Sequence, residues 1–212
     1  RSTLFPYTTL FRSRTGGFLF AKLLTDPVWW FYLFWLPAFL KTKGITGTQQ
    51  SWPLIAVYSM ATIGSIAGGW MSSSFIKKGW TINKSRKTAM LLFAVMMLPL
   101  LFIRYVDTVT MALVLIGLAC GAHQAWSANL FTTVSDQFPK KAVSTIVGIG
   151  GMAGSVGGIF FAGGVGKILD NYKLAGNLEA GYNTVFIVCG LAYLTALFIF
   201  HLLSPKMKTV SL

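Results

Sequence analysis

Four side chains that could contact a polar solute lie inside one long apolar segment, Val109–Val134. They are His123, Gln124, Trp126 and Asn129. Polar groups are costly in the hydrocarbon of a membrane unless they face a partner or a water-filled path. Their presence therefore predicts a solute pathway through a bundle of helices.

Three of these residues, His123, Trp126 and Asn129, recur at every third position, and on a helix they cover an arc of about 120°. Such an arc can line a cavity, where the polar groups bind sugar hydroxyls and Trp126 offers a flat face to a pyranose ring. The alternative is hydrogen bonding between helices, which contributes about 0.6–2 kcal/mol per contact in membranes. Similarly, His123 is either a neutral packing group or a proton relay.

A second pair that could carry chemistry is Lys22 and Asp26, which are four residues apart. Inside a bundle, Lys22 would offer a cation to a substrate carboxylate and Asp26 would orient it. In the alternative, Asp26 caps a helix that begins at Pro27, and Lys22 extends to the membrane surface. A helix that starts there and ends at Leu40 covers only roughly 21 Å, which is too short to span a membrane.

An aromatic cluster follows Asp26, and its members are Trp29, Trp30, Phe31, Tyr32, Phe34 and Trp35. They surround the whole helix, so some face lipid and others face neighbouring helices. Trp30 and Tyr32 are the candidates for a cavity, together with Tyr58 on the next apolar segment.

Glycines at positions 150, 154 and 158 lie on one face of another apolar segment. Small residues at this spacing let two helix backbones approach closely, so the face predicts helix packing. The alternative is that it brings the helix axis close to a substrate.

The composition is that of an integral membrane protein. The 212 residues are 54% hydrophobic and 11% charged, whereas a soluble domain has about 25% charged residues. The formal net charge of +13 does not indicate nucleic-acid binding, because the basic residues sit in short gaps between apolar runs. Cys120 and Cys189 lie within such runs, which favours buried apolar residues over a disulfide or a metal pair.

Nothing in the sequence indicates an enzyme. The chain has five Asp and Glu residues in all, too few for a carboxylate-based catalytic site in the spans. It contains no HExxH, CxxC, GxxxxGK[ST] or GxSxG pattern. We therefore expect no cofactor and no metal.

Six segments are long and apolar enough to cross a membrane. Their approximate limits are Phe18–Leu40, Trp52–Ile76, Thr88–Ile103, Val109–Val134, Ala142–Val165 and Tyr182–Leu203. The runs are continuous and do not alternate, so they predict an all-α membrane protein with six transmembrane helices.

Basic residues are unevenly shared between the two sides of these spans. One side holds Lys22, Lys77, Lys78, Lys84, Arg86, Lys87, Lys140, Lys141, Lys206 and Lys208, and the other holds Lys41, Lys43, Arg104, Lys167 and Lys173. Since basic loops stay in the cytoplasm, both ends of the native segment are predicted to be cytoplasmic.

The first residues require separate treatment. TLFPYTTLFRS, at Thr3–Ser13, matches the in-frame translation of a common sequencing adapter. Residues 1–14 are therefore predicted to be a non-native segment, and residues 15–212 to form the six-helix membrane unit.

Four stretches carry a family resemblance. They are DPVWWFYLFWLPAFL at Asp26–Leu40, GGWMSSSFIKKGWTINKSRK at Gly68–Lys87, HQAWSANLFTTVSDQFPKKAV at His123–Val143 and GIGGMAGSVGG at Gly148–Gly158. From about residue 15 onward, the chain resembles the C-terminal half of a major facilitator superfamily transporter. Within that superfamily it is similar to the anion:cation symporter family, and most similar to its bacterial hexuronate transporters.

The resemblance implies helices seven to twelve of a twelve-helix transporter, built as two inverted three-helix repeats, with the first six helices missing. It also implies that the segment after Gly69 is a cytoplasmic gating loop. Members often have Asp after Gly-x-x-Ser, whereas here Ser73 follows Ser72, so an acidic contact at that position is absent or replaced. The family's proton-coupling carboxylates usually lie in the missing half.

The implied function is symport of a small organic anion with protons across a bacterial inner membrane, by alternating access. Hexuronates such as glucuronate and galacturonate are the expected substrates. The expected partners are the substrate, protons, the lipid bilayer and the missing N-terminal half, with no nucleic acid. Galactonate, glucarate or tartrate remain alternative substrates, and a transporter-like sugar-acid sensor is an alternative function.

Overall fold

Six helical spans build the part of the chain that the structure describes. The structure is a computed structural model that describes residues 4–106 and 108–207, so Lys208 lies outside it. The helices are α1 (Leu4–Thr42), α2 (Ser51–Lys77), α3 (Ile82–Val95), α4 (Val109–Gln137), α5 (Lys140–Leu174) and α6 (Leu178–Leu203), with short 3₁₀ helices η1 (Gly47–Gln50) and η2 (Leu98–Tyr105). In the described residues, six helical stretches are long and apolar enough to cross a membrane, which confirms the all-α prediction.

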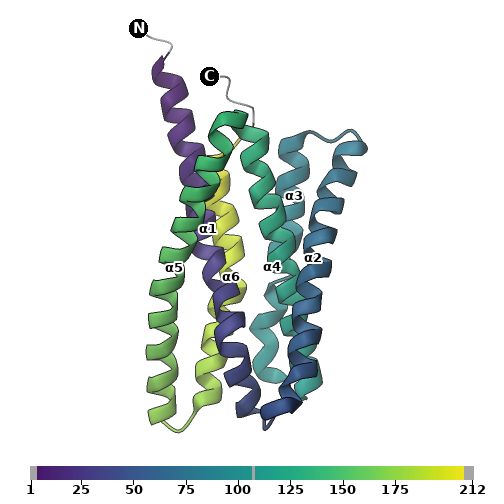
Figure 1. Cartoon of the computed structure of the whole chain (residues 1–212), viewed down its shortest axis with the longest axis vertical. Coiled ribbons are helices and arrows are strands. Elements are labelled where there is room, and N and C mark those ends of the chain that lie inside the picture. Colours follow the sequence, from purple (N-terminus) through teal and green to yellow (C-terminus); the bar gives the residue numbers. More distant parts are fainter. Residues whose placement is uncertain (1–3, 107, 208–212) are drawn as a thin grey trace.

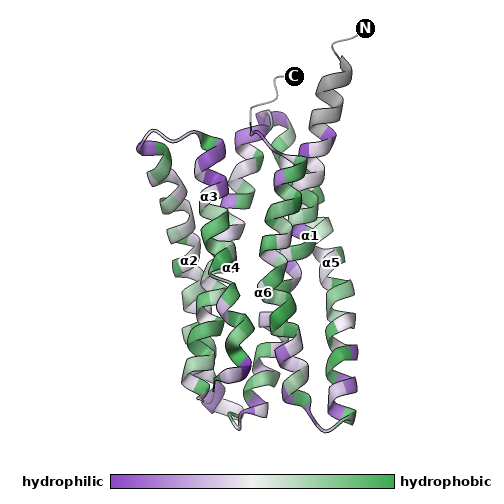
Figure 2. Cartoon of the chain, turned by 180° about the vertical axis from the view of Figure 1, so that it is seen from behind, coloured by the Kyte–Doolittle hydropathy of each residue, from purple (hydrophilic) through white to green (hydrophobic). Residues whose placement is uncertain are grey.

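The helices run side by side along the long axis of the molecule (Figure 1). The α2–α3 and α4–α5 connections lie at the same end of the bundle as the start of α1 and the end of α6, and the α1–α2 and α5–α6 connections lie at the other end. The basic segment Lys77–Lys87 and the pair Lys140 and Lys141 therefore share one end. We call this the basic end. Between the two ends the helices consist mostly of hydrophobic residues (Figure 2), as expected for helices that cross a membrane.

The third span differs from its prediction. The segment Thr88–Ile103 was expected to be one helix, but α3 already begins at Ile82 and ends at Val95, and η2 continues from Leu98 to Tyr105. Pro99 at the start of η2 explains the change, because proline lacks a backbone N–H and its ring clashes with the preceding helical turn.

Close contact between helices depends on glycine in two places. In the first, α2 lies against α4, where a Cβ at Gly64 would overlap the backbone carbonyl of Gly121. One turn on, a Cβ at Gly68 would come within 2.5 Å of the Ala125 Cα. Backbone lies against backbone here, so no larger residue fits without separating the two helices.

In the second place, the glycine face of α5 lies against α1. A Cβ at Gly150 would overlap the Phe18 ring, one at Gly154 would overlap the Asp26 carboxylate, and one at Gly158 would come within 2.9 Å of the Trp30 ring. The packing interpretation of this face is therefore the one that the structure supports.

These two contacts follow the same pattern of pairing. If α1–α3 is one repeat and α4–α6 the other, the first helix of each repeat packs against the second helix of its partner. Two repeats related by an approximate two-fold axis would produce this reciprocal pairing of first and second helices. The arrangement matches the half-transporter architecture expected above.

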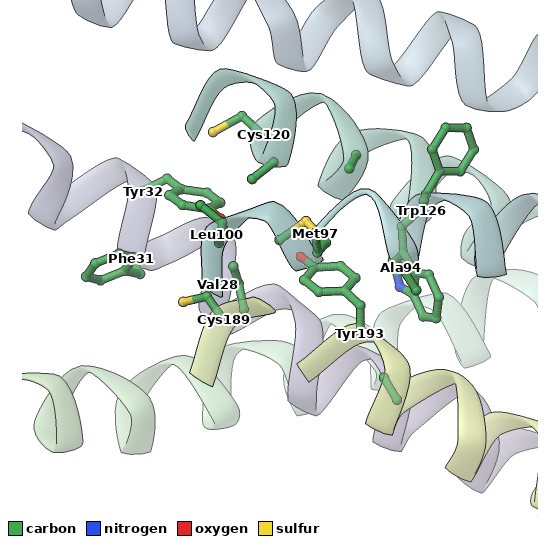
Figure 3. Packing of buried hydrophobic residues seen from close by; sticks show 14 of the residues in the cluster. Val28, Phe31, Tyr32, Ala94, Met97, Leu100, Cys120, Trp126, Cys189 and Tyr193 are labelled. Atoms are coloured by element: carbon green, nitrogen blue, oxygen red, sulfur yellow. The ribbon is translucent and has the colours of Figure 1, made fainter. Parts of the chain in front are cut away.

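A cluster of buried aromatic and sulfur-containing side chains fills the middle of the bundle (Figure 3). Tyr32, Trp126 and Tyr193 are fully buried in it. Cys120 and Cys189 are also buried, and both are free thiols, in agreement with the prediction that they are small packing residues.

At the basic end, one arginine joins three helices. Arg86, which the sequence analysis placed in a loop, lies in α3 and is buried. Its Nε donates to Asp136 Oδ2 of α4 at 2.9 Å, and its Nη1 donates to Ser72 Oγ of α2 at 2.6 Å. Asp136 of α4 and Ser72 of α2 therefore bind the same guanidinium group, although Ser73 is not acidic.

Candidate functional site

The candidate site begins with an ion pair on α1, in which the lysine is buried and the aspartate is half-buried. Lys22 Nζ lies 2.6 Å from Asp26 Oδ2, and the two side chains are 6% and 19% exposed. The α-helical spacing of four residues puts them one turn apart on the same face. Because α1 begins at Leu4, Asp26 does not cap a helix and Lys22 does not extend to the membrane surface. Both lie near the middle of the membrane span Arg12–Thr42.

Neighbouring helices close around this pair. Lys22 Nζ lies 4.3 Å from the centre of the Phe131 ring of α4, a cation–π contact that is stronger where water is excluded. On the other side, Gly154 of α5 leaves the space that the Asp26 carboxylate occupies. The pair is thus held by three helices, and its charges are balanced within the bundle.

A second group of side chains lies around His123 on α4. The His123 ring stacks on Trp29 of α1, with centroids 5.3 Å apart and planes 7° apart. Its Nδ1 is hydrogen-bonded to the hydroxyl of Tyr193 on α6. Tyr193 also packs edge-on against Trp126 at 5.5 Å and donates to the Thr25 carbonyl at 3.4 Å. The imidazole is therefore held between α1 and α6 in a fixed orientation.

Tyr58 extends the same wall from α2. Its hydroxyl donates to the Tyr32 backbone carbonyl at 3.1 Å, and its ring meets Trp29 edge-on at 6.3 Å. The Tyr32 side chain points into the buried cluster, and its hydroxyl has no hydrogen-bond partner among the described residues. Trp29 therefore contacts the two predicted residues His123 and Tyr58.

Other predicted residues lie apart from this group. Asn129 Nδ2 donates to the Gly68 carbonyl of α2 at 2.9 Å, which is the contact between helices that the sequence left open. Gln124 is half-buried, and Trp30 is 37% exposed and stacks on Phe34. The structure thus brings His123 and Tyr58 together around Trp29, which lies about one turn along α1 from Asp26 and its partner Lys22.

Sequence reasoning missed Trp29 and Tyr193. A signal for Trp29 was present, because positions 22, 26 and 29 fall on one face of a helix at 100° per residue. No such signal exists for Tyr193, since its partner His123 is 70 residues away in the sequence. Only the packing of α6 against α4 brings them together.

The site residues supply several kinds of chemical group. Lys22 provides an ammonium group whose counter-charge is the Asp26 carboxylate, and further along α1 the Trp29 indole packs against the His123 imidazole and the Tyr58 phenol. Among the described residues, no group of three or more His, Cys, Asp or Glu side chains could hold a metal ion.

Comparison with known proteins gives consistent results. The chain is 30% identical over 156 residues to the hexuronate transporter of Escherichia coli K12, covering 73% of this chain and 36% of that protein. It is 23% identical over 167 residues to the D-galactonate transporter of Escherichia coli O6:H1, covering 78% and 39%. It is 26% identical over 148 residues to the probable galactarate/D-glucarate transporter of Escherichia coli K12, covering 68% and 32%.

The chain therefore spans between 32% and 39% of the length of these relatives. The relatives are transporters of sugar acids and not enzymes. A family profile matches residues 1–162 of the chain. This match and the six helical spans agree, and the chain belongs to the Major Facilitator Superfamily.

Proposed function

We propose that this chain forms the C-terminal half of a proton-coupled symporter for hexuronates such as glucuronate and galacturonate. The names of the relatives support a sugar acid as the substrate. The exposed apolar surface of the six spans supports a place in a membrane, here the bacterial inner membrane. The missing N-terminal half would complete the pathway and supply the proton-coupling carboxylates.

The observation that carries this proposal is the pair formed by the buried Lys22 and the half-buried Asp26. The Lys22 ammonium is 2.6 Å from a carboxylate in the middle of a membrane span. A substrate carboxylate that displaces Asp26 replaces one charge-assisted hydrogen bond with another of the same kind. The exchange leaves no buried charge without a partner, provided that Asp26 takes up a proton as it is released. Asp26 would then stay neutral while the substrate carboxylate is bound to Lys22.

The ring of a sugar acid would lie against the aromatic wall next to this pair. Trp29 offers an apolar face, while His123 and Tyr58 carry groups that can hydrogen-bond to hydroxyls. Alternating access then requires the two halves to rock around this site.

The test is uptake of labelled glucuronate and galacturonate by the complete transporter that contains this chain, with and without a proton uncoupler. We expect saturable uptake that the uncoupler abolishes and that Lys22→Gln reduces at least tenfold, since the substrate loses a charge-assisted hydrogen bond worth about 1.5–3 kcal/mol. The matched control is Lys173→Gln, because Lys173 is exposed at the end of α5.

Three outcomes would contradict parts of this proposal. Uptake that is unchanged in Lys22→Gln, at equal protein levels, would remove Lys22 from substrate binding. Uptake of galactonate or glucarate alone would keep the sugar-acid class and exclude hexuronates. Binding of a sugar acid without any uptake would favour a sensor over a transporter.

A further inference from the structure

A groove between α3 and α6 has a polar and an apolar half. Its volume is about 500 Å³, and it lies among the last residues of α6 and the first residues of α3. Lys84, Lys87 and His201 line the polar half, which opens at the basic end. Leu91, Leu194 and Phe198 line the apolar half.

The positive charge in the polar half has no acidic partner in the described residues. Lys87 Nζ donates to the Ser204 carbonyl at 2.5 Å and to the Pro205 carbonyl at 2.9 Å, and it lies 3.2 Å from His201 Nδ1. Lys84 Nζ lies 4.1 Å above the Trp80 ring. The ion pairs seen in the described part of the chain involve other cations. An anion that enters the groove would therefore meet two lysines that no carboxylate of the described residues neutralises.

The two walls change from polar to apolar in the same direction. On α3, positions 84, 87 and 91 follow one helical face inward from the basic end, and on α6 positions 201, 198 and 194 do the same. Seven residues of helix correspond to about 10 Å. Trp80, packed on Phe75 just outside the groove, is a residue type that favours the level of lipid headgroups. The groove thus matches the step from the headgroup region to the hydrocarbon.

We propose that this groove is a binding site for an anionic phospholipid. The phosphate lies against Lys84, Lys87 and His201, and an acyl chain follows Leu91, Leu194 and Phe198. A free phosphate would satisfy only the polar half. The apolar half opens onto the lipid-facing surface, where Leu91 is 45% and Phe198 is 64% exposed. Basic pockets between transmembrane helices bind acidic headgroups in this way.

The experiment is a lipid titration of the complete 212-residue chain purified in detergent, with bound lipid read by native mass spectrometry. The probes are phosphatidylglycerol and phosphatidylcholine with identical acyl chains. We expect phosphatidylglycerol to bind more tightly, and Lys84→Gln to weaken it about fivefold, the effect of one basic group at a membrane surface. Leu91→Trp, which obstructs the apolar half and leaves the charges unchanged, should weaken both lipids.

Lys173→Gln is the matched control, since it removes an exposed lysine at the opposite end of the bundle. Lys84 and Leu91 are themselves exposed, so neither substitution should prevent folding, and the helix content by circular dichroism checks this. The proposal is overturned if the two lipids bind equally, or if Lys173→Gln weakens binding as much as Lys84→Gln. It is also overturned if millimolar inorganic phosphate displaces the lipid, since the site would then take a soluble anion.

Discussion

At the scale of single residues, the pair formed by Lys22 and Asp26 is the feature most sensitive to change. Transfer of either ion from water into the bundle is costly, and the cost is offset only while the two stay together. A buried pair of this kind contributes little net stability compared with apolar side chains of similar size. Its presence in the middle of a membrane span therefore points to a role in binding.

We predict that Asp26→Asn destabilises the purified chain by about 3 kcal/mol, because it leaves the Lys22 ammonium buried without a counter-charge. The double variant Lys22→Met with Asp26→Leu should recover most of this loss, since neither charge then remains. The measurement is unfolding of the detergent-solubilised chain, followed by circular dichroism. Asp170→Asn, at an exposed position, is the control. If Asp26→Asn and Asp170→Asn lowered the stability equally, the Lys22 and Asp26 pair would not be shielded from water.

The sequence predicted some of the site and could not predict the rest. The contact between Lys22 and Asp26 follows from local spacing on one helix, and so it was available in advance. The hydrogen bond between His123 and Tyr193 depends on how α4 and α6 pack. The arc of His123, Trp126 and Asn129 was correct as a helical pattern, yet it does not face one cavity. His123 and Trp126 contact Tyr193 of α6, whereas Asn129 bonds to α2.

At the scale of elements, small residues determine which helices lie together. The contact between α2 and α4 joins backbone to backbone at Gly64 and Gly121. In a membrane, association of helices depends on such close packing, since lipid is as apolar as the side chains. The equivalent contact between α1 and α5 at Gly154 also shapes the space for the Asp26 carboxylate. In α5, therefore, the same glycine allows the close helix contact and sets the geometry of the site.

We predict that Gly64→Ala destabilises the chain by about 1–3 kcal/mol, because the added methyl group meets the rigid carbonyl of Gly121. Gly69→Ala on the same helix is the matched control, since a Cβ there has nothing within 4 Å. It should be neutral or stabilising by about 0.5–1 kcal/mol, the helix preference of Ala over Gly. Comparison of the unfolding midpoints of the two variants tests this, and equal midpoints would contradict close packing at Gly64.

The limits of the spans show where hydropathy alone fails as a predictor. Apolar runs located all six spans, because length and composition are what a membrane requires. They did not locate the change from α3 to η2, since hydropathy does not record the missing N–H of Pro99. They also placed Arg86 in a loop, although its bonds to Asp136 and Ser72 let a charged residue lie buried inside α3.

At the scale of the whole molecule, the two ends of the bundle differ in charge. The basic end carries the start of α1, the end of α6 and the connections with most of the lysines, and the opposite end carries the connection between α5 and α6. Lys22 no longer adds to this difference, because it is buried and paired. The remaining bias still favours the basic end in the cytoplasm, where the groove between α3 and α6 would meet the inner leaflet.

Cysteine labelling in spheroplasts tests this orientation. Ser135→Cys lies at the basic end of α4 and Asn171→Cys at the far end of α5, and both positions are exposed and uncharged. We predict that a membrane-impermeant maleimide labels Asn171→Cys in intact spheroplasts, and labels Ser135→Cys only after lysis. The unmodified chain should stay unlabelled, because Cys120 and Cys189 are buried. The reverse pattern would place the basic end outside the cell. Acidic headgroups attract basic residues mainly at the cytoplasmic surface, so the proposed lipid groove would then lie away from these headgroups.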